Sequence, residues 1–91
     1  MTMEKTAISG HPRTLIQQAH EELVRIRPNR DASLQAWLFY YERSAALYDR
    51  IADTDPSHKL EAQYWAQRER DHARGIAARM RTAPSARRRR K

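Results

Sequence analysis

Apolar and polar residues follow helical spacing in three segments of the chain. The first segment runs from about residue 12 to residue 26. Five apolar side chains there fall within one arc of about 100°, and they are Leu15, Ile16, Ala19, Leu23 and Ile26. An arc of this width is typical of a helix that packs on a single neighbour. The helix begins at Pro12 or at Thr14, because Thr14 and Gln17 have the spacing of a capping box. Pro28 then disfavours helical geometry at the residue before it.

The second segment, about residues 32–53, has the widest apolar surface. Its arc covers about 200° and is interrupted by Ser44; the members are Leu34, Ala36, Trp37, Leu38, Tyr40, Tyr41, Ala45, Leu47, Tyr48, Ile51 and Ala52. Two neighbours are needed to cover such an arc. We expect Asp31 to cap this helix. Phe39 lies on the opposite, charged face.

The third segment, residues 56–82, begins where Asp55 has the character of a helix cap and Pro56 that of a first helical residue. Small residues dominate its apolar arc, which would let this helix lie close to a neighbour; the members are Ala62, Trp65, Ala66, Ala73, Ile76, Ala77 and Met80. Gly75 weakens the helix interior. Pro84 is expected to end the helix.

Together these segments predict an all-α fold, an antiparallel bundle of three helices, over residues 12–82 of the 91-residue chain. Residues 1–11 are expected to form a disordered N-terminus. Residues 83–91 are expected to form a disordered, arginine-rich tail.

Composition argues against several classes of protein. The chain has no cysteine and two glycines, which excludes thiolate chemistry and glycine-rich phosphate loops. No serine is placed for nucleophilic catalysis beside a histidine, so we expect no enzyme activity and no cofactor. No stretch approaches the roughly 18 apolar residues of a membrane span, and the start lacks the apolar run of a signal peptide. A cytoplasmic location is therefore expected.

Positive charge is concentrated at one end of the chain. The formal net charge is +7, yet residues 1–67 carry eight basic residues against nine acidic ones. From Arg68 onward, ten basic residues stand against Glu69 and Asp71. The last five residues are all cationic: Arg87, Arg88, Arg89, Arg90 and Lys91. This end of the chain is suited to contact with a polyanion.

A polar stripe on the third helix leads into that basic terminus. Its residues project opposite the apolar arc within about 60° of one another, and they are Gln63, Gln67, Arg70, Arg74 and Arg81. Arginine and glutamine suit phosphate and base-edge contacts, so stripe and tail together predict a nucleic-acid interface with a sequence-independent component. The alternative is a solvated face on which aspartates occupy Arg70 and Arg74. Anionic membrane surfaces are a weaker alternative, because the tail has no apolar anchor.

Two other groups of residues suggest further roles. Phe39 and Tyr64 face away from the predicted core and are candidates for a protein interface, in a homodimer or an adaptor that would also use the wide apolar arc of the second helix. The remaining aromatic residues could form a stacking platform for bases, but their positions in the packing arcs favour a core role; they are Trp37, Tyr40, Tyr41, Tyr48 and Trp65. Glu69 and His72 have the spacing of a metal-ligand pair, but the second copy that such bundle sites require is missing, so no metal is expected. Glu69 is expected instead to be a hydrogen-bonded partner of a tyrosine, histidine or arginine.

Residues 40–80 combine an aromatic pair, an Ala-Ala-Leu-Tyr segment, an Asp-Pro turn and a Tyr-Trp-Ala segment, and in this combination they resemble small uncharacterised helical proteins of actinomycetes. The resemblance covers this whole segment, YYERSAALYDRIADTDPSHKLEAQYWAQRERDHARGIAARM. It implies a bacterial cytoplasmic setting and supplies no activity or functional residue. Its further implication, a regulatory role beside phage or plasmid genes, is a hypothesis.

Overall fold

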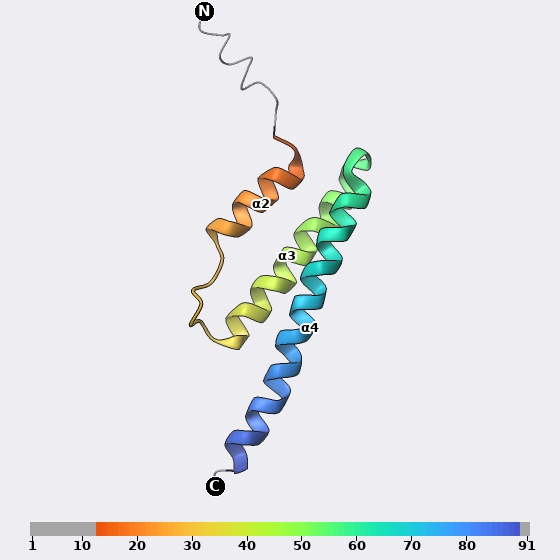
Figure 1. Cartoon of the computed structure of the whole chain (residues 1–91). Coiled ribbons are helices and arrows are strands. Elements are labelled where there is room, and N and C mark those ends of the chain that lie inside the picture. The colour runs from red at the N-terminus through yellow and green to blue at the C-terminus, as the bar shows by residue number, and fades with distance from the viewer. Residues whose placement is uncertain (1–12, 90–91) are drawn as a thin grey trace, which may run out of the picture.

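The chain folds into helices joined by short connections. A computed structural model describes the backbone of residues 13–89 and the side chains of residues 13–82. Within this range the elements are α2 (Leu15–Arg25), α3 (Leu34–Thr54), the short 3₁₀ helix η1 (Pro56–His58) and α4 (Lys59–Arg89) (Figure 1). The described residues contain no strand, so the predicted all-α class is confirmed. The predicted disordered N-terminus, residues 1–11, lies outside the described residues.

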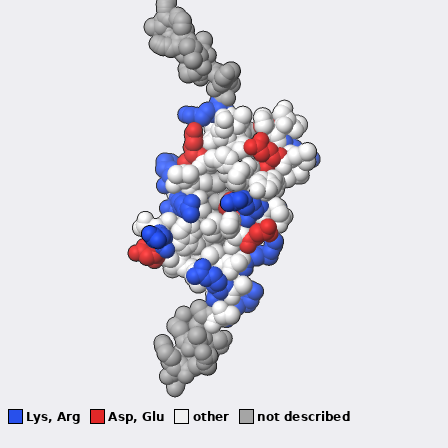
Figure 2. Space-filling model, viewed as in Figure 1, with Lys and Arg blue, Asp and Glu red and all other residues white. Residues whose placement is uncertain are grey.

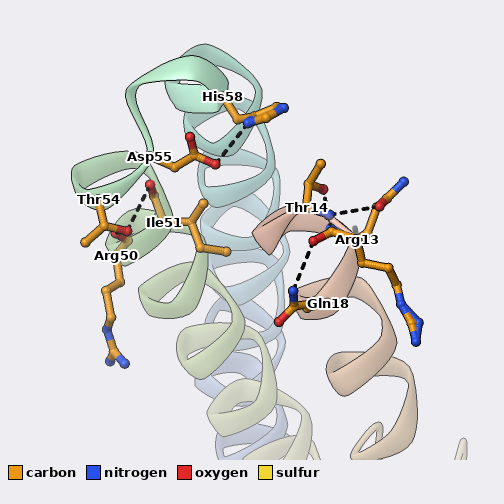
Figure 3. Close-up of polar contacts among 9 residues, drawn as sticks. Arg13, Thr14, Gln18, Arg50, Ile51, Thr54, Asp55 and His58 are labelled. Carbon is orange, nitrogen blue, oxygen red and sulfur yellow. Dashed lines mark hydrogen bonds and ion pairs between the residues drawn. The ribbon is translucent and has the colours of Figure 1, made fainter. Parts of the chain in front are cut away.

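Helix α2 begins at the predicted capping box. The Thr14 hydroxyl accepts a hydrogen bond from the Gln17 amide at 3.0 Å, and the Thr14 amide donates to the Gln17 side chain at 2.9 Å. The side-chain amide of the neighbouring Gln18 also donates to the Arg13 backbone carbonyl, at 3.1 Å (Figure 3). The capping box thus gives hydrogen-bond partners to the backbone amides of Thr14 and Gln17, which have no partner within the helix.

Helix α3 begins two residues later than expected, and its cap is not Asp31. The Ser33 hydroxyl accepts from the Ala36 amide at 3.1 Å and caps the helix. The Ala32 amide is already used in a turn, where it donates to the Asn29 carbonyl at 2.9 Å. Because this turn holds residues 29–32 outside the helix, serine rather than aspartate reaches the first free amides.

The connection between α3 and α4 also differs from the prediction. The Asp55 side chain makes no capping hydrogen bond to the backbone. Its carboxylate lies 2.9 Å from Nδ1 of His58 instead (Figure 3). Pro56 opens the single turn of η1, and α4 starts only at Lys59.

Helices α3 and α4 lie side by side as an antiparallel hairpin, and α4 extends beyond the start of α3 (Figure 1). The predicted helix end at residue 82 is wrong, because α4 continues through Pro84 to Arg89. Pro84 removes one backbone donor and its ring crowds the carbonyl four residues earlier, but the alanines and arginines around it are strong helix formers that favour continuation. The predicted disordered tail is therefore not confirmed over residues 83–89.

All three helices contribute to one buried core. Its members are Ile16, Ala19 and Leu23 from α2, Tyr48, Ile51 and Ala52 from α3, and Ala62 and Ala66 from α4. The last two alanines are 0% exposed, as expected where small side chains let two helices approach closely. Ser44, the polar residue within the apolar arc of α3, is also 0% exposed. Its hydroxyl donates to the Tyr40 carbonyl at 2.8 Å, which satisfies the buried group.

Candidate nucleic-acid interface

The predicted polar stripe of α4 lies on the protein surface. Gln63, Gln67, Arg74 and Arg81 are exposed, and Arg70 is half-buried. The helix that carries them also extends toward the basic terminus (Figure 1). The side chains of the terminal part of the predicted site, Arg87, Arg88, Arg89, Arg90 and Lys91, lie outside the described residues.

Aspartates occupy much of this stripe. Arg70 forms an ion pair with Asp49 of α3, with 2.7 Å between the guanidinium nitrogen and the carboxylate oxygen. Arg74 forms an ion pair with Asp71 one turn earlier on α4. The Gln67 amide group donates to the same aspartate at 3.0 Å. Two of the three arginines of the stripe are thus neutralised by neighbouring aspartates. This observation favours the alternative that the stripe is a solvated face. Arg81 has no ion pair with another described residue.

The two predicted protein-interface residues are exposed aromatic rings. Phe39 on α3 is 60% exposed and Tyr64 on α4 is 58% exposed. Tyr64 packs edge-on against Trp65, with ring centroids 5.2 Å apart. Both positions agree with the sequence pattern, which placed these rings away from the core.

A second surface, not identified from the sequence, combines aromatic rings with arginines. Three rings form a row from α3 to α4. The Trp37 and Tyr41 centroids are 5.7 Å apart with 32° between the ring planes. Tyr41 stacks on His72, at 4.8 Å and 24°. The Arg27 guanidinium lies over the other end of the row, 5.3 Å from the Trp37 ring centroid. This arrangement is a cation–π contact and keeps a planar cation at the surface.

Two adjoining hollows open along this row. One, of about 350 Å³, is lined by Arg27, Arg30, Ala32, Leu34, Trp37, Tyr41, Ile76 and Arg79. The other, of about 210 Å³, is lined by Arg27, Tyr40, Tyr41, Arg68, Glu69 and His72. Arg27 and Tyr41 belong to both. We call the surface formed by Arg27, Arg30, Trp37, Tyr41, Arg68, Glu69, His72 and Arg79 the Arg–aromatic face.

Positive charge on the Arg–aromatic face is not neutralised by ion pairs. Its four arginines stand against one carboxylate, Glu69, and none forms an ion pair with another described residue. They come from the α2–α3 connection and from α4, so folding gathers charges that are dispersed in the sequence. Figure 2 shows basic side chains gathered at the end of the described surface where α4 leaves the hairpin. Potentials of this kind attract anions.

Charge and burial act together on the tyrosines behind this face. Burial raises the pKa of Tyr40, and the Glu69 carboxylate adds to the effect while Arg27 opposes it. Burial, followed by the charge of Glu69, raises the pKa of Tyr48 to about 12. Among the described residues Glu69 makes no hydrogen bond within 3.5 Å, so its predicted hydrogen-bonding role is not found. Glu69 acts on its neighbours through its charge.

Sequence reasoning missed the Arg–aromatic face because it assigned Trp37 and Tyr41 to the core. Both rings are only half-buried. The available signal was Arg27 and Arg30 on either side of Pro28, just before an aromatic helix start. The pairing of Tyr41 with His72 could not be read from spacing, because 31 positions separate them and their contact depends on how α3 and α4 align.

Comparison with protein families, with curated proteins and with solved structures finds no match for this chain. The resemblance to small actinomycete proteins therefore stays a prediction. None of the helices in the described part of the chain is both long and apolar enough to cross a membrane.

Proposed function

We propose that this chain is a non-enzymatic accessory or regulatory protein that binds nucleic acid through basic side chains. The observation that supports it is the Arg–aromatic face, where four arginines line adjoining hollows without an ion-pair partner among the described residues. Cations that no carboxylate neutralises remain available to phosphates.

The basic terminus is the second contributor to this proposal. Five adjacent cations, Arg87 to Lys91, repel one another and are not needed for a fold. The first three belong to the end of α4, the helix that also carries Arg79 and Arg81, so one strand of nucleic acid could contact all of these cations together. Arg70 and Arg74 contribute less, because Asp49 and Asp71 neutralise them.

The test is the fluorescence anisotropy of labelled duplex DNA, single-stranded DNA and RNA, titrated with the full chain at several salt concentrations. On duplex DNA the logarithm of affinity should fall with the logarithm of salt by about 0.9 per phosphate contacted. A variant in which the last five residues are all glutamine should lose about four to five units of that slope if the whole terminus engages. Absence of binding to all three ligands at physiological salt would refute the proposal.

A second candidate function is a protein-interaction module, including a homodimer. It is favoured by the exposure of Phe39 and Tyr64, whose rings present apolar surface to solvent. Sedimentation velocity over a range of concentrations tests it. A dimer that Phe39→Glu converts to monomer would support this candidate, whereas wild-type protein that stays monomeric throughout would exclude the homodimer. Val24→Glu, at an exposed apolar position of α2, adds the same single charge and is the control.

A further inference from the structure

The Arg–aromatic face differs from a simple patch of positive charge, because three neighbouring rings line it, two of them stacked. Trp37, Tyr41 and His72 lie in sequence along the row, at centroid separations of 5.7 Å and 4.8 Å. His72 is exposed at one end, and the Arg27 guanidinium covers Trp37 at the other. A planar group arriving from solvent can therefore stack on His72, on the edge of Tyr41 or on the outer face of Arg27.

The two hollows along the row differ in charge. The hollow of about 350 Å³ contains Arg27, Arg30 and Arg79 and no acidic residue. Its volume is within the range of roughly 300–1,000 Å³ found for ligand sites. The hollow of about 210 Å³ also contains Glu69, beside His72. A phosphate is attracted to the first hollow, whereas the carboxylate in the second repels phosphate and accepts hydrogen bonds from amino groups such as those on base edges.

This division matches the chemistry of a nucleotide, which has an anionic phosphate at one end and a flat base with amino groups at the other. Bases inside a duplex are already stacked and paired, so they cannot reach a ring row lying in a hollow. Unpaired bases can, and proteins that bind single strands combine basic grooves with aromatic side chains for this reason. Duplex DNA would use only the arginines of the face.

We propose that the Arg–aromatic face is a binding site for single-stranded nucleic acid, in which Arg30 and Arg79 hold a phosphate and an unpaired base stacks on the exposed ring of His72, whose other neighbour in the row is Tyr41. The inference rests on the proposed function and adds the class of ligand and the residues that select it. It places selectivity for single strands in the tertiary structure, whereas the basic terminus attracts any polyanion.

The test compares a single-stranded DNA oligomer with a hairpin duplex of the same nucleotide number, at one salt concentration and with full-length protein. Three variants are measured beside the wild type. The double variant Arg30→Gln/Arg79→Gln removes two charges from the face. The double variant Arg43→Gln/Arg50→Gln removes two charges from exposed positions of α3 outside it and is the matched control. Tyr41→Leu removes a ring and leaves the charges.

Wild-type protein should bind the single strand at least about tenfold more tightly than the duplex. Tyr41→Leu should weaken single-strand binding by about 5- to 150-fold, the range for the loss of one stacking contact, and change duplex binding much less. Arg30→Gln/Arg79→Gln should weaken single-strand binding more than its control. In a Trp65→Phe background Trp37 is the one remaining tryptophan, so its fluorescence should change when the single strand binds.

Three results would overturn the inference, and they differ in what they say about the proposed function. Equal affinity for both ligands, with the face variant behaving like its control, would leave nucleic-acid binding in place and move it to the terminus. Preference for duplex DNA would also leave nucleic-acid binding in place, but would exclude the Arg–aromatic face as a site for unpaired bases. No binding to either ligand would remove both proposals and direct the search to a protein partner. If Tyr41→Leu unfolds, the two arginine double variants decide, because their substitutions lie at exposed positions.

Discussion

His20 Nδ1 lies 2.5 Å from the hydroxyl of Tyr48, a contact that joins α2 to α3 at the edge of the core. The His20 ring also packs edge-on against Trp65 of α4, with centroids 4.8 Å apart. One half-buried histidine thus contacts both helices of the hairpin. Nearby, the Tyr40 hydroxyl donates to the Leu23 carbonyl at 2.9 Å. That carbonyl is in the last turn of α2, where the helix leaves acceptors unpaired.

Tyr48→Phe should destabilise the protein by about 1–2 kcal/mol, because it leaves the His20 nitrogen without its partner at the helix interface. Urea denaturation followed by circular dichroism measures this change. Tyr64→Phe is the matched control, since that hydroxyl is on an exposed ring, and it should change the free energy of unfolding by less than about 0.5 kcal/mol. Equal effects of the two substitutions would show that the contact with His20 contributes nothing.

Alkaline pH should destabilise the fold through Tyr48. Its pKa in the folded protein is about 12, against an ordinary value of 10.0. The unfolded chain therefore releases this proton first, and the phenol's contribution to stability is fully present below about pH 10. It should be lost as pH rises through the folded pKa. Tyrosinate absorbance should show a late titration step that Tyr48→Phe removes. If Tyr48→Phe instead removed a step at the ordinary pKa, the burial of this hydroxyl would be contradicted.

Ala66→Leu should destabilise the hairpin by about 1–3 kcal/mol, because the added atoms enter a position that is completely buried between helices. Ala78→Leu is the control on the same helix, at an exposed position. It should stay within about 0.5 kcal/mol of the wild type. Chemical denaturation of both variants measures the difference. Similar stability of the two would mean that α4 does not approach its neighbours closely at Ala66.

Gly75→Ala should stabilise the protein by up to about 1 kcal/mol. A Cβ atom placed on Gly75 meets no atom within 4 Å, so the gain in helix propensity carries no steric cost. Ala78→Gly, the reverse change at another exposed position of α4, should lower stability by a similar amount. Thermal unfolding of the two variants should therefore shift in opposite directions. A lower melting temperature for Gly75→Ala would indicate that the helix needs flexibility there.

The ion pair between Arg70 and Asp49 should contribute little stability, although it links α4 to α3. Both side chains are about half exposed, and such pairs contribute roughly 0.2–1 kcal/mol. A double-mutant cycle with Arg70→Ala and Asp49→Ala measures the coupling, which should shrink at high salt. Coupling above about 2 kcal/mol, insensitive to salt, would contradict this assignment.

Residues close together in sequence made much of the fold predictable. The capping box at Thr14 and Gln17 and the interruption at Pro28 act over a few positions, and the structure places the start and end of α2 accordingly. The helix starts that were predicted incorrectly are those at which two local signals compete. Ser33 caps α3 in place of Asp31, because a turn already uses the amide of Ala32. The Asp55 carboxylate contacts Nδ1 of His58 and does not cap a backbone amide.

Helical periodicity alone predicts the helical class, the three apolar arcs and the burial of small residues on α4, because it places residues on faces without reference to any partner. Which arginines lack an ion-pair partner, in contrast, depends on how the helices pack. Asp49 meets Arg70 across the hairpin, whereas Arg27 and Arg79 meet no carboxylate at ion-pairing distance among the described residues. Such pairings depend on how separate helices align along their axes, and no pattern within one helix contains that alignment.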